Sequence, residues 1–248
     1  MHELFNRTEL LLGEETLKYM ENRKVLIVGL GGVGAYAAEM ICRAGIGNIL
    51  IIDGDTIDKS NINRQLLALN DNIGKYKTDI LEQRLKKINP EVSIRSITEF
   101  IRNERITEIL NEGFDYVVDA IDILTHKVTL IENCINLKLP IISAMGAGGK
   151  MDPTMIQIAD IEKSFNCRLA KMVRKRLHRK NIFGGFKVVF SPENVNGSII
   201  KPDESADSFL TAKSTVGTIS YMPAIFGCLC SSVVIQTFVN QFNQRHKS

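Results

Sequence analysis

The sequence contains a glycine-rich turn of the kind that holds the phosphates of a nucleotide. The glycines are Gly29, Gly31, Gly32 and Gly34, between an apolar run and a helical pattern. The first glycine permits a tight turn, the next lets backbone approach a phosphate, and the last lets the helix pack on the strand. Asp53 follows 19 residues after Gly34, where a carboxylate can accept hydrogen bonds from ribose hydroxyls. The sequence therefore predicts a nucleotide site, which on this pattern alone is most often one for NAD or FAD.

Charged residues further along the chain indicate a triphosphate and its Mg²⁺ rather than a dinucleotide. Asp55 precedes the segment 60–65 (SNINRQ), which contains Arg64, and Lys77 and Asp122 come later. Mg²⁺ prefers one or two carboxylates together with phosphate oxygens. The arginine and the lysine would neutralise charge on the α-phosphate and on the leaving pyrophosphate. Taken singly, each cation would be a solvated surface charge, and Asp122 would be a helix N-cap.

Strands and helices alternate in the half of the chain that contains these residues. The apolar runs and their periodicity predict strands at 24–29, 48–53, 92–97, 114–119 and 140–143, and helices at 33–44, 75–89, 104–111 and 124–137. Strands joined by helices predict an α/β, Rossmann-like fold with a doubly wound, mainly parallel sheet.

The pattern changes after residue 150, and we expect an elaborated C-terminal half. It predicts strands at 154–160 and 187–191, a basic helix at 163–180 and a long loop at 192–213. Because no interdomain linker is evident, we expect a single domain spanning 1–248. Its parts would be an N-terminal arm (1–23), a nucleotide-binding core (24–150) and a substrate and dimer half (151–248).

The predicted basic helix is a candidate surface for nucleic acid. Nine lysines and arginines and no acidic residue occur between Lys163 and Lys187, although the net charge of the whole chain is only +3. Such a run attracts a phosphate backbone through counterion release, and its alternative interpretation is a solvated helix face. The candidate contacts are Arg168, Lys171, Arg174, Lys175, Arg176, Arg179 and Lys180.

Composition and cysteine content favour a cytoplasmic globular protein. The chain of 248 residues is 44% apolar and 24% charged, which excludes collagen-like and disordered classes. Its five cysteines form no C-x-x-C pair, so we expect reduced thiols and no zinc site.

The uncharged stretch 214–244 predicts a buried core or dimer-interface helix; a membrane span and peripheral membrane contact are its alternatives.

Taken in order, the motifs GLGGVG, IIDGD, SNINRQ and DAID, with Lys77, resemble the ATP-dependent adenylating superfamily related to ubiquitin activators (ThiF/MoeB type). The resemblance implies MgATP binding, a homodimer, and an N-terminal arm whose Arg7 reaches the partner's ATP site. The ligands of MgATP that it implies, with the neighbouring positions of the same motifs, are Gly32, Asp53, Asp55, Asn61, Asn63, Arg64, Gln65, Lys77 and Asp122.

Further motifs resemble one group within this superfamily, the tRNA threonylcarbamoyladenosine dehydratases. They include RAGIG, INP, AGG and DPT. The resemblance implies ATP-dependent cyclisation of the modified adenosine through an acyl-adenylate, without a catalytic cysteine. It also implies a monovalent cation (K⁺ or Na⁺) near the glycine-rich loop Gly146–Gly149 and the loop before the C-terminal helix, and a sulfur-relay or cysteine-desulfurase-associated partner.

Two other functions stay open at this point. One is adenylation of the C-terminal glycine of a ubiquitin-like sulfur carrier, which would use the same ATP site. The absence of zinc pairs and the basic helix favour tRNA over that carrier. The other is a dinucleotide sensor or dehydrogenase, for which Arg64, Lys77 and Asp122 would have no role. Cys167, beside the basic helix, is a minor candidate for a thioester.

Overall fold

A seven-stranded sheet forms the centre of the protein in a computed structural model, which describes residues 3–102, 104–202 and 214–246. The strand order is β3-β2-β1-β4-β5-β7-β6, and every neighbouring pair is parallel except β6 with β7. The Rossmann-like, mainly parallel fold is therefore confirmed. The strands are β1 (Lys24–Val28), β2 (Asn48–Ile52), β3 (Ser93–Ile97), β4 (Tyr116–Asp119), β5 (Ile141–Ala144), β6 (Gln157–Asp160) and β7 (Lys187–Phe190).

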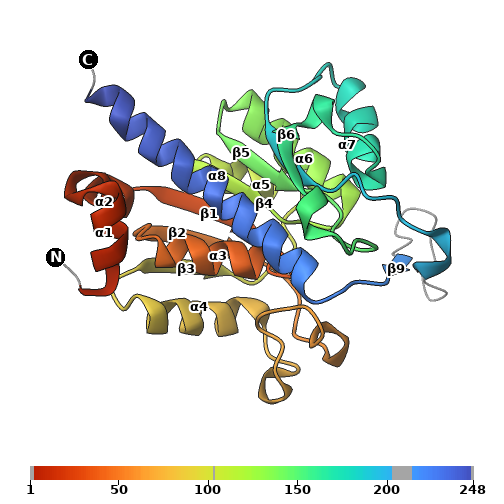
Figure 1. Cartoon of the computed structure of the whole chain (residues 1–248), viewed down its shortest axis with the longest axis horizontal. Coiled ribbons are helices and arrows are strands. Elements are labelled where there is room, and N and C mark those ends of the chain that lie inside the picture. Colours follow the sequence, from red (N-terminus) through yellow and green to blue (C-terminus); the bar gives the residue numbers. More distant parts are fainter. Residues whose placement is uncertain (1–2, 103, 203–213, 247–248) are drawn as a thin grey trace.

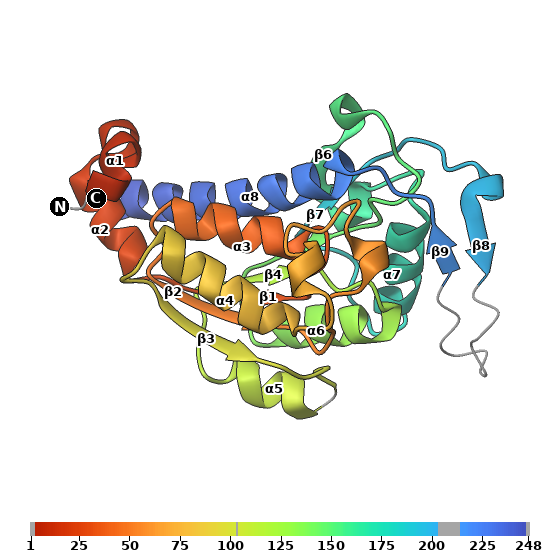
Figure 2. The same ribbon diagram turned by 90° about the horizontal axis from the view of Figure 1, so that it is seen from below.

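Helices cover both faces of this sheet (Figures 1 and 2). One layer holds α3 (Gly34–Arg43), α4 (Lys77–Ile88) and α8 (Tyr221–Arg245), and the other holds α5 (Glu104–Leu110), α6 (Leu124–Asn136) and α7 (Arg168–His178). Successive strand residues point to opposite faces. Val25 and Ile27 accordingly pack with the first layer, and Leu26 and Val28 with the second. Burial on both faces explains the uninterrupted apolar runs of the central strands.

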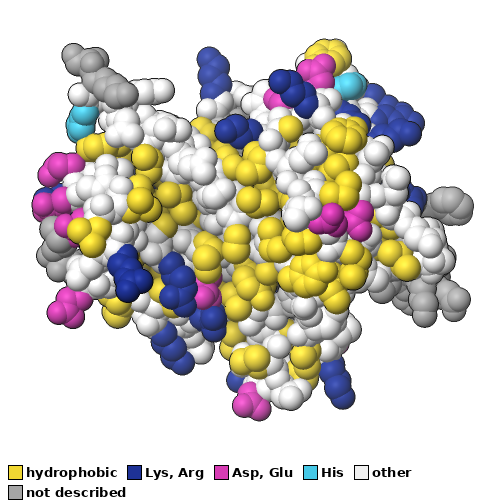
Figure 3. Space-filling model, viewed as in Figure 1, with side chains coloured by type: hydrophobic (Ala, Val, Ile, Leu, Met, Phe, Trp, Pro, Cys, Tyr) yellow, Lys and Arg dark blue, Asp and Glu magenta, His cyan; other side chains and the backbone are white. Residues whose placement is uncertain are grey.

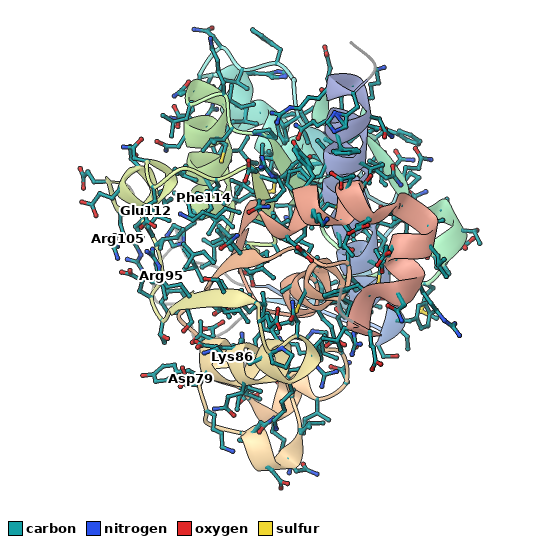
Figure 4. The ribbon with its side chains drawn as sticks, turned by 90° about the vertical axis from the view of Figure 1, so that its left-hand side faces the viewer. Asp79, Lys86, Arg95, Arg105, Glu112 and Phe114 are labelled. Carbon is teal, nitrogen blue, oxygen red and sulfur yellow. The ribbon has the colours of Figure 1, made fainter. Side chains whose placement is uncertain are left out.

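The edge strand β3 is protected by charge. Arg95 of β3 pairs with Glu112, which follows α5, at 2.7 Å between Nη2 and Oε1. Figure 4 shows this pair beside Arg105 and Phe114. Charged side chains on an exposed edge discourage pairing with another chain.

The longest helix, α8, is a core helix along part of its length. By length and hydropathy it is the one helix of the described residues that could cross a membrane, and half of its most apolar window is buried. It packs closely on α3: a Cβ added at Gly227 would lie 2.4 Å from the carbonyl oxygen of Val33. The buried half accounts for part of the apolar character of this helix.

The N-terminal arm lies at the C-terminal end of α8 (Figure 1). It consists of a 3₁₀ turn (Glu3–Phe5), α1 (Asn6–Leu12) and α2 (Glu14–Glu21). The hydroxyl of Tyr19 donates to Gln241 at 3.3 Å, and its ring lies 5.6 Å from that of Phe242.

The predicted boundaries of the C-terminal half need two corrections. The helix expected at 163–180 is shorter, because Asp160 caps a separate 3₁₀ turn (Ile161–Lys163) by accepting from the amide of Glu162, and α7 begins only at Arg168. The loop expected at 192–213 contains a 3₁₀ turn (Gly197–Ile199) and β8 (Ile200–Pro202), which pairs with β9 (Ser214–Val216). Residues 203–213 of that loop lie outside the described residues.

Candidate active site

The glycine-rich turn connects β1 to α3 at the carboxyl edge of the sheet. Gly29 has a φ of +88°, and a Cβ there would lie 2.7 Å from the carbonyl oxygen of Ala120. A Cβ at Gly34 would lie 1.7 Å from the carbonyl oxygen of Gly29. Both positions therefore exclude a side chain: the first needs a left-handed backbone, and the last lets α3 lie against the strand end. The amides at the start of α3 face this edge, as anion binding requires.

Asp53, at the end of β2, holds the glycine-rich turn in place. Its Oδ2 accepts from the amide of Leu30 at 2.6 Å, and its Oδ1 accepts from the amide of Asp55 at 2.8 Å. Burial raises the pKa of this carboxyl group, and the charge of Lys77 opposes that shift. A carboxylate has about four acceptor positions, so the two amides leave capacity for the hydroxyl groups of a ribose.

Lys77 forms an ion pair beneath the same edge. Its side chain is buried in the first turn of α4, and its Nζ lies 3.0 Å from Oδ2 of Asp55, whose side chain is 44% exposed. A cation at a helix N-terminus is unfavourable for the helix dipole, and a buried cation needs a partner. Asp55 therefore fixes the lysine at this position.

The segment 60–65 lies against the glycine-rich turn. A Cβ at Gly32 would lie 3.4 Å from the carbonyl oxygen of Arg64 and 2.9 Å from Cβ of Pro223, and one at Gly31 would lie 3.8 Å from Nε2 of Gln65. Nη1 of Arg64 donates to the carbonyl oxygen of Ser60 at 2.9 Å. The turn, this segment and the start of α8 thus meet at one place.

Two amide side chains of this segment have structural partners, and one lacks a partner. Oδ1 of Asn61 accepts from the amide of Asp58 and completes a local cap. Nδ2 of Asn63 donates to the carbonyl oxygen of Thr218 at 2.9 Å. Oε1 of Gln65 is buried and has no hydrogen-bond partner among the described residues. A buried acceptor without a donor is costly, so Gln65 is ready to accept from a ligand.

Asp122 lies in the loop between β4 and α6, and its side chain is exposed. The N-cap of α6 is Ile123, without a side-chain cap, so the interpretation of Asp122 as an N-cap is wrong. Ala120, two residues earlier, contacts Gly29. Asp122 therefore belongs to the same edge, and its exposed carboxylate forms no hydrogen bond or ion pair with the described residues.

Sequence reasoning missed a buried ion pair directly below this loop. Nζ of Lys127 lies 2.7 Å from Oδ2 of Asp119, both side chains are inaccessible to solvent, and Oγ of Ser143 donates to the same oxygen at 2.6 Å. Oδ1 of Asp119 accepts from the amide of Ile121. The pair therefore shapes the turn that leads to Asp122. The signal in the sequence was a lysine next to Val128 on the apolar face of α6.

Metal-ligating groups are sparse. The described residues contain no group of three or more His, Cys, Asp and Glu side chains that could hold a metal ion.

The cysteine thiols of α3 and α6 are buried. Burial raises the pKa of Cys42 to about 11 and also raises that of Cys134. These two residues lie on α3 and α6, as predicted. Cys167 is buried at the N-cap of α7.

The candidate nucleic-acid contacts on α7 divide into two sets (Figure 3 shows basic side chains at the upper right, where α7 lies). Arg174 donates to the carbonyl oxygen of Ser164, Arg176 donates to Oγ1 of Thr125, and Lys180 pairs with Glu132. These three cations are engaged within the protein, which the sequence did not predict. Four are exposed, and their side chains have no hydrogen bond or ion pair with the described residues: Arg168, Lys171, Lys175 and Arg179.

Arg7 is far from the glycine-rich turn of its own chain. It is exposed on α1. Its arm packs on Gln241 and Phe242, whereas the turn packs on Pro223. Phe242 follows Pro223 by nineteen positions along α8, which is about 28 Å at 1.5 Å per residue. The structure does not bring Arg7 to the other candidate site residues.

Known proteins resemble this chain over nearly its whole length. The model of the ThiF family matches residues 5–248. The tRNA threonylcarbamoyladenosine dehydratase of Bacillus subtilis is 37% identical over 235 residues, which cover 93% of this chain and 92% of that protein. The crystal structure of the Escherichia coli tRNA N6-threonylcarbamoyladenosine dehydratase in complex with ATP has a TM-score of 0.86 and 32% identity, and covers 98% of this chain and 96% of that one. The crystal structure of the same protein in complex with AMP has the same TM-score, identity and coverage of both chains.

Proposed function

The chain belongs to the ThiF family, and from this membership we propose that it is an ATP-dependent enzyme that dehydrates threonylcarbamoyladenosine in tRNA. The observation that carries the proposal is the meeting of the glycine-rich turn with Asp53, Lys77 and the segment 60–65 at one edge of the sheet. The relatives that are bound to ATP and to AMP have this fold over nearly their whole length.

In the first step, the carboxylate of the threonylcarbamoyl group attacks the α-phosphorus of ATP. A new O–P bond forms, the bond to the β-phosphate oxygen breaks, and pyrophosphate leaves. Arg64 and Lys77 stabilise the charge that develops on the phosphates. Asp53 would accept hydrogen bonds from the ribose, and the α3 amides would face the phosphates. The product of this step is an acyl-adenylate.

Mg²⁺ fits the donors at this edge. Asp122 offers one exposed carboxylate, and Mg²⁺ in phosphate sites is commonly held by one or two carboxylates together with phosphate oxygens. When bound, the ion would neutralise phosphate charge.

In the second step, an atom of the same side chain attacks the activated carbonyl and closes a ring. The carboxylate oxygen that was adenylated leaves with AMP, and a proton of the attacking group passes to solvent, so the nucleoside loses one water overall. Intramolecular attack has a high effective molarity. This accounts for chemistry without an enzyme nucleophile, in agreement with the burial of Cys167.

We also propose a homodimer in which Arg7 serves the partner's ATP site. The separation of the arm from the turn of its own chain supports this arrangement, since Arg7 cannot reach that turn. Leu10 and Leu11 on α1 are 88% and 81% exposed, and exposed apolar patches mark interaction sites. A symmetric pair would use the same surface twice.

We also propose a monovalent cation, which takes no part in the two chemical steps above. Its expected place is beside the loop that follows β5. There the ammonium group of Lys150 donates to the carbonyl oxygens of Ser191, at 3.0 Å, and of Glu193. Cytoplasmic location, peripheral membrane contact and a sulfur-relay partner also stay predictions.

The proposal is tested by supplying the enzyme with ATP and two alternative substrates. We expect AMP and pyrophosphate to form with tRNA carrying threonylcarbamoyladenosine, and neither to form with a ubiquitin-like sulfur-carrier protein. Unmodified tRNA is the matched control, because it lacks the attacking carboxylate. Turnover with the carrier protein alone would overturn the assignment.

A further inference from the structure

One face of α7 carries a stripe of cations that pair with no carboxylate of the described residues. Arg168, Lys171, Lys175 and Arg179 succeed one another at steps of three or four residues, so they share a face of the helix. All four are exposed, and their side chains have no hydrogen bond or ion pair with the described residues. The other three candidate contacts, Arg174, Arg176 and Lys180, are engaged within the protein. The free stripe is complementary to a polyanion.

Exposed aromatic rings flank this stripe. Phe165 precedes α7 and is 49% exposed, and Phe183 follows it and is 56% exposed. The ring of Phe165 stands edge-on to that of buried Phe190, with centroids 5.8 Å apart, and this contact restrains the ring of Phe165. The ring of Phe183 lies 5.1 Å from that of His178. Cations flanked by exposed aromatic rings suit unpaired bases, whereas a paired stem is recognised through its shape and backbone.

The helix that carries the stripe packs against loops at the carboxyl edge of the sheet. Leu169 lies beside Gly146, in the loop that follows β5: a Cβ at Gly146 would be 3.9 Å from Cβ of Leu169. On the same helix, Nη1 of Arg176 donates to Oγ1 of Thr125, three residues after Asp122. The helix that carries the stripe therefore packs beside two loops of the sheet edge, those that follow β4 and β5.

We propose that this surface binds the single-stranded loop of the RNA substrate, with Phe165 stacking on an unpaired base and the four cations contacting the backbone phosphates. The inference rests on the proposed function and adds to it how the RNA is held. A nucleotide presented for chemistry at the sheet edge must be unpaired, because a base inside a duplex is not accessible. Phe165 then acts by holding a neighbouring base.

The stacking contact is tested with two RNA probes, an anticodon stem-loop carrying threonylcarbamoyladenosine and a duplex of the same stem sequence. Fluorescence anisotropy measures the dissociation constant of each. We expect Phe165→Leu to weaken binding of the stem-loop about tenfold, the effect of losing one stacked base, and to leave binding of the duplex unchanged. Phe165→Trp keeps a stacking face and should bind the stem-loop like the original protein. Equal binding of stem-loop and duplex by the original protein would overturn the proposal.

The phosphate contacts are tested by a matched pair of charge removals. Lys175→Gln removes a cation of the stripe, and Lys180→Gln removes one that pairs with Glu132. We expect Lys175→Gln to reduce the slope of log affinity against log salt by about 0.7–1, and Lys180→Gln to leave it unchanged. Equal slopes for the two variants would contradict the stripe.

This proposal and the proposed function fail in different ways. Turnover of the modified tRNA by the original protein, together with unchanged affinities of Phe165→Leu and Lys175→Gln, would refute the RNA surface alone. If the original protein did not turn over that tRNA, the function itself would be wrong. Thermal unfolding of each variant checks that altered binding does not arise from unfolding.

Discussion

The charges at the sheet edge and the charges on α7 are arranged in opposite ways. Lys77 and Lys127 are buried, and each lies within 3.0 Å of one carboxylate. Arg168 and Lys175 are exposed, and their side chains have no such partner among the described residues. Both regions are basic, yet the first is fixed by the fold and the second is open to solvent.

This difference indicates two modes of recognition. A buried charge is tolerated only with a partner and with satisfied hydrogen bonds, so its position is held before any ligand arrives. Such a site suits one small ligand whose reacting atoms must be placed closely. Exposed cations keep their hydration and rotamer freedom, and they suit a long polyanion whose affinity depends on salt. Three predictions test this distinction, and a fourth tests the chemistry at the sheet edge.

The largest effect, on stability, is expected for the buried ion pair of Lys127 with Asp119. Lys127→Met leaves the carboxylate of Asp119 buried without its cation, so we expect the free energy of unfolding to fall by about 3–5 kcal/mol. Urea denaturation measures this quantity. The matched control is Lys86→Met, which removes an exposed partner of Glu82 and should cost less than about 1 kcal/mol. Similar losses for the two variants would remove the distinction between fixed and open charges.

Loss of a phosphate-binding cation at the sheet edge comes next. Arg64→Ala should lower kcat/KM for AMP formation about 10²- to 10³-fold, as is typical when one preorganised donor is removed from a reacting group. This loss of kcat/KM should persist at low salt. Arg179→Ala removes the same charge from the stripe on α7, and its smaller loss should be recovered at low salt. Recovery of Arg64→Ala at low salt would contradict the comparison.

Salt should separate the two ligands of the unaltered protein. If four phosphates are contacted, affinity for a single-stranded loop should fall roughly 50-fold between 50 and 200 mM salt, from a slope of about 0.7 for each contact. Calorimetry of ATP binding over the same range should show a much smaller change. An equally steep dependence for ATP would indicate that the sheet edge is as open as α7.

The smallest effect is expected for a cysteine. Cys167→Ala should change the rate of AMP formation less than about twofold, because the ring-closing atom belongs to the substrate and intramolecular attack needs no enzyme nucleophile. The residue is buried at the start of α7. A rapid-quench assay with modified tRNA measures the rate, and a strong loss with an intact fold would show that a thioester step has been overlooked.

Local patterns predicted most of the fold. The apolar runs ending at Gly29 and Asp53 marked the strands of the sheet edge, because a parallel strand buried on both faces needs consecutive apolar residues. The steric requirement at Gly34 was also evident, since close packing of helix on strand is a property of the turn itself. The antiparallel pairing of the edge strand β6 with β7 was not predicted, because strand order depends on contacts distant in sequence.

The candidate site was predictable in its residue types and less so in its contacts. Lys77 and Arg64 were recognised from motifs, but the pairing of Lys77 with Asp55 is a tertiary contact. The basic run on α7 could not be divided by sequence, because the partners Thr125 and Glu132 come from α6. Lys127 was overlooked since its partner lies on a strand, and composition alone does not show that both are buried.

The measurement that tests the account most directly is the mass of tRNA carrying threonylcarbamoyladenosine before and after incubation with the enzyme, ATP and magnesium. The account predicts that the modified nucleoside loses one water, with one AMP formed for each nucleoside converted. The dehydratase assignment would be contradicted if the mass of the nucleoside stayed unchanged and the protein bound nicotinamide dinucleotide tightly but did not bind ATP.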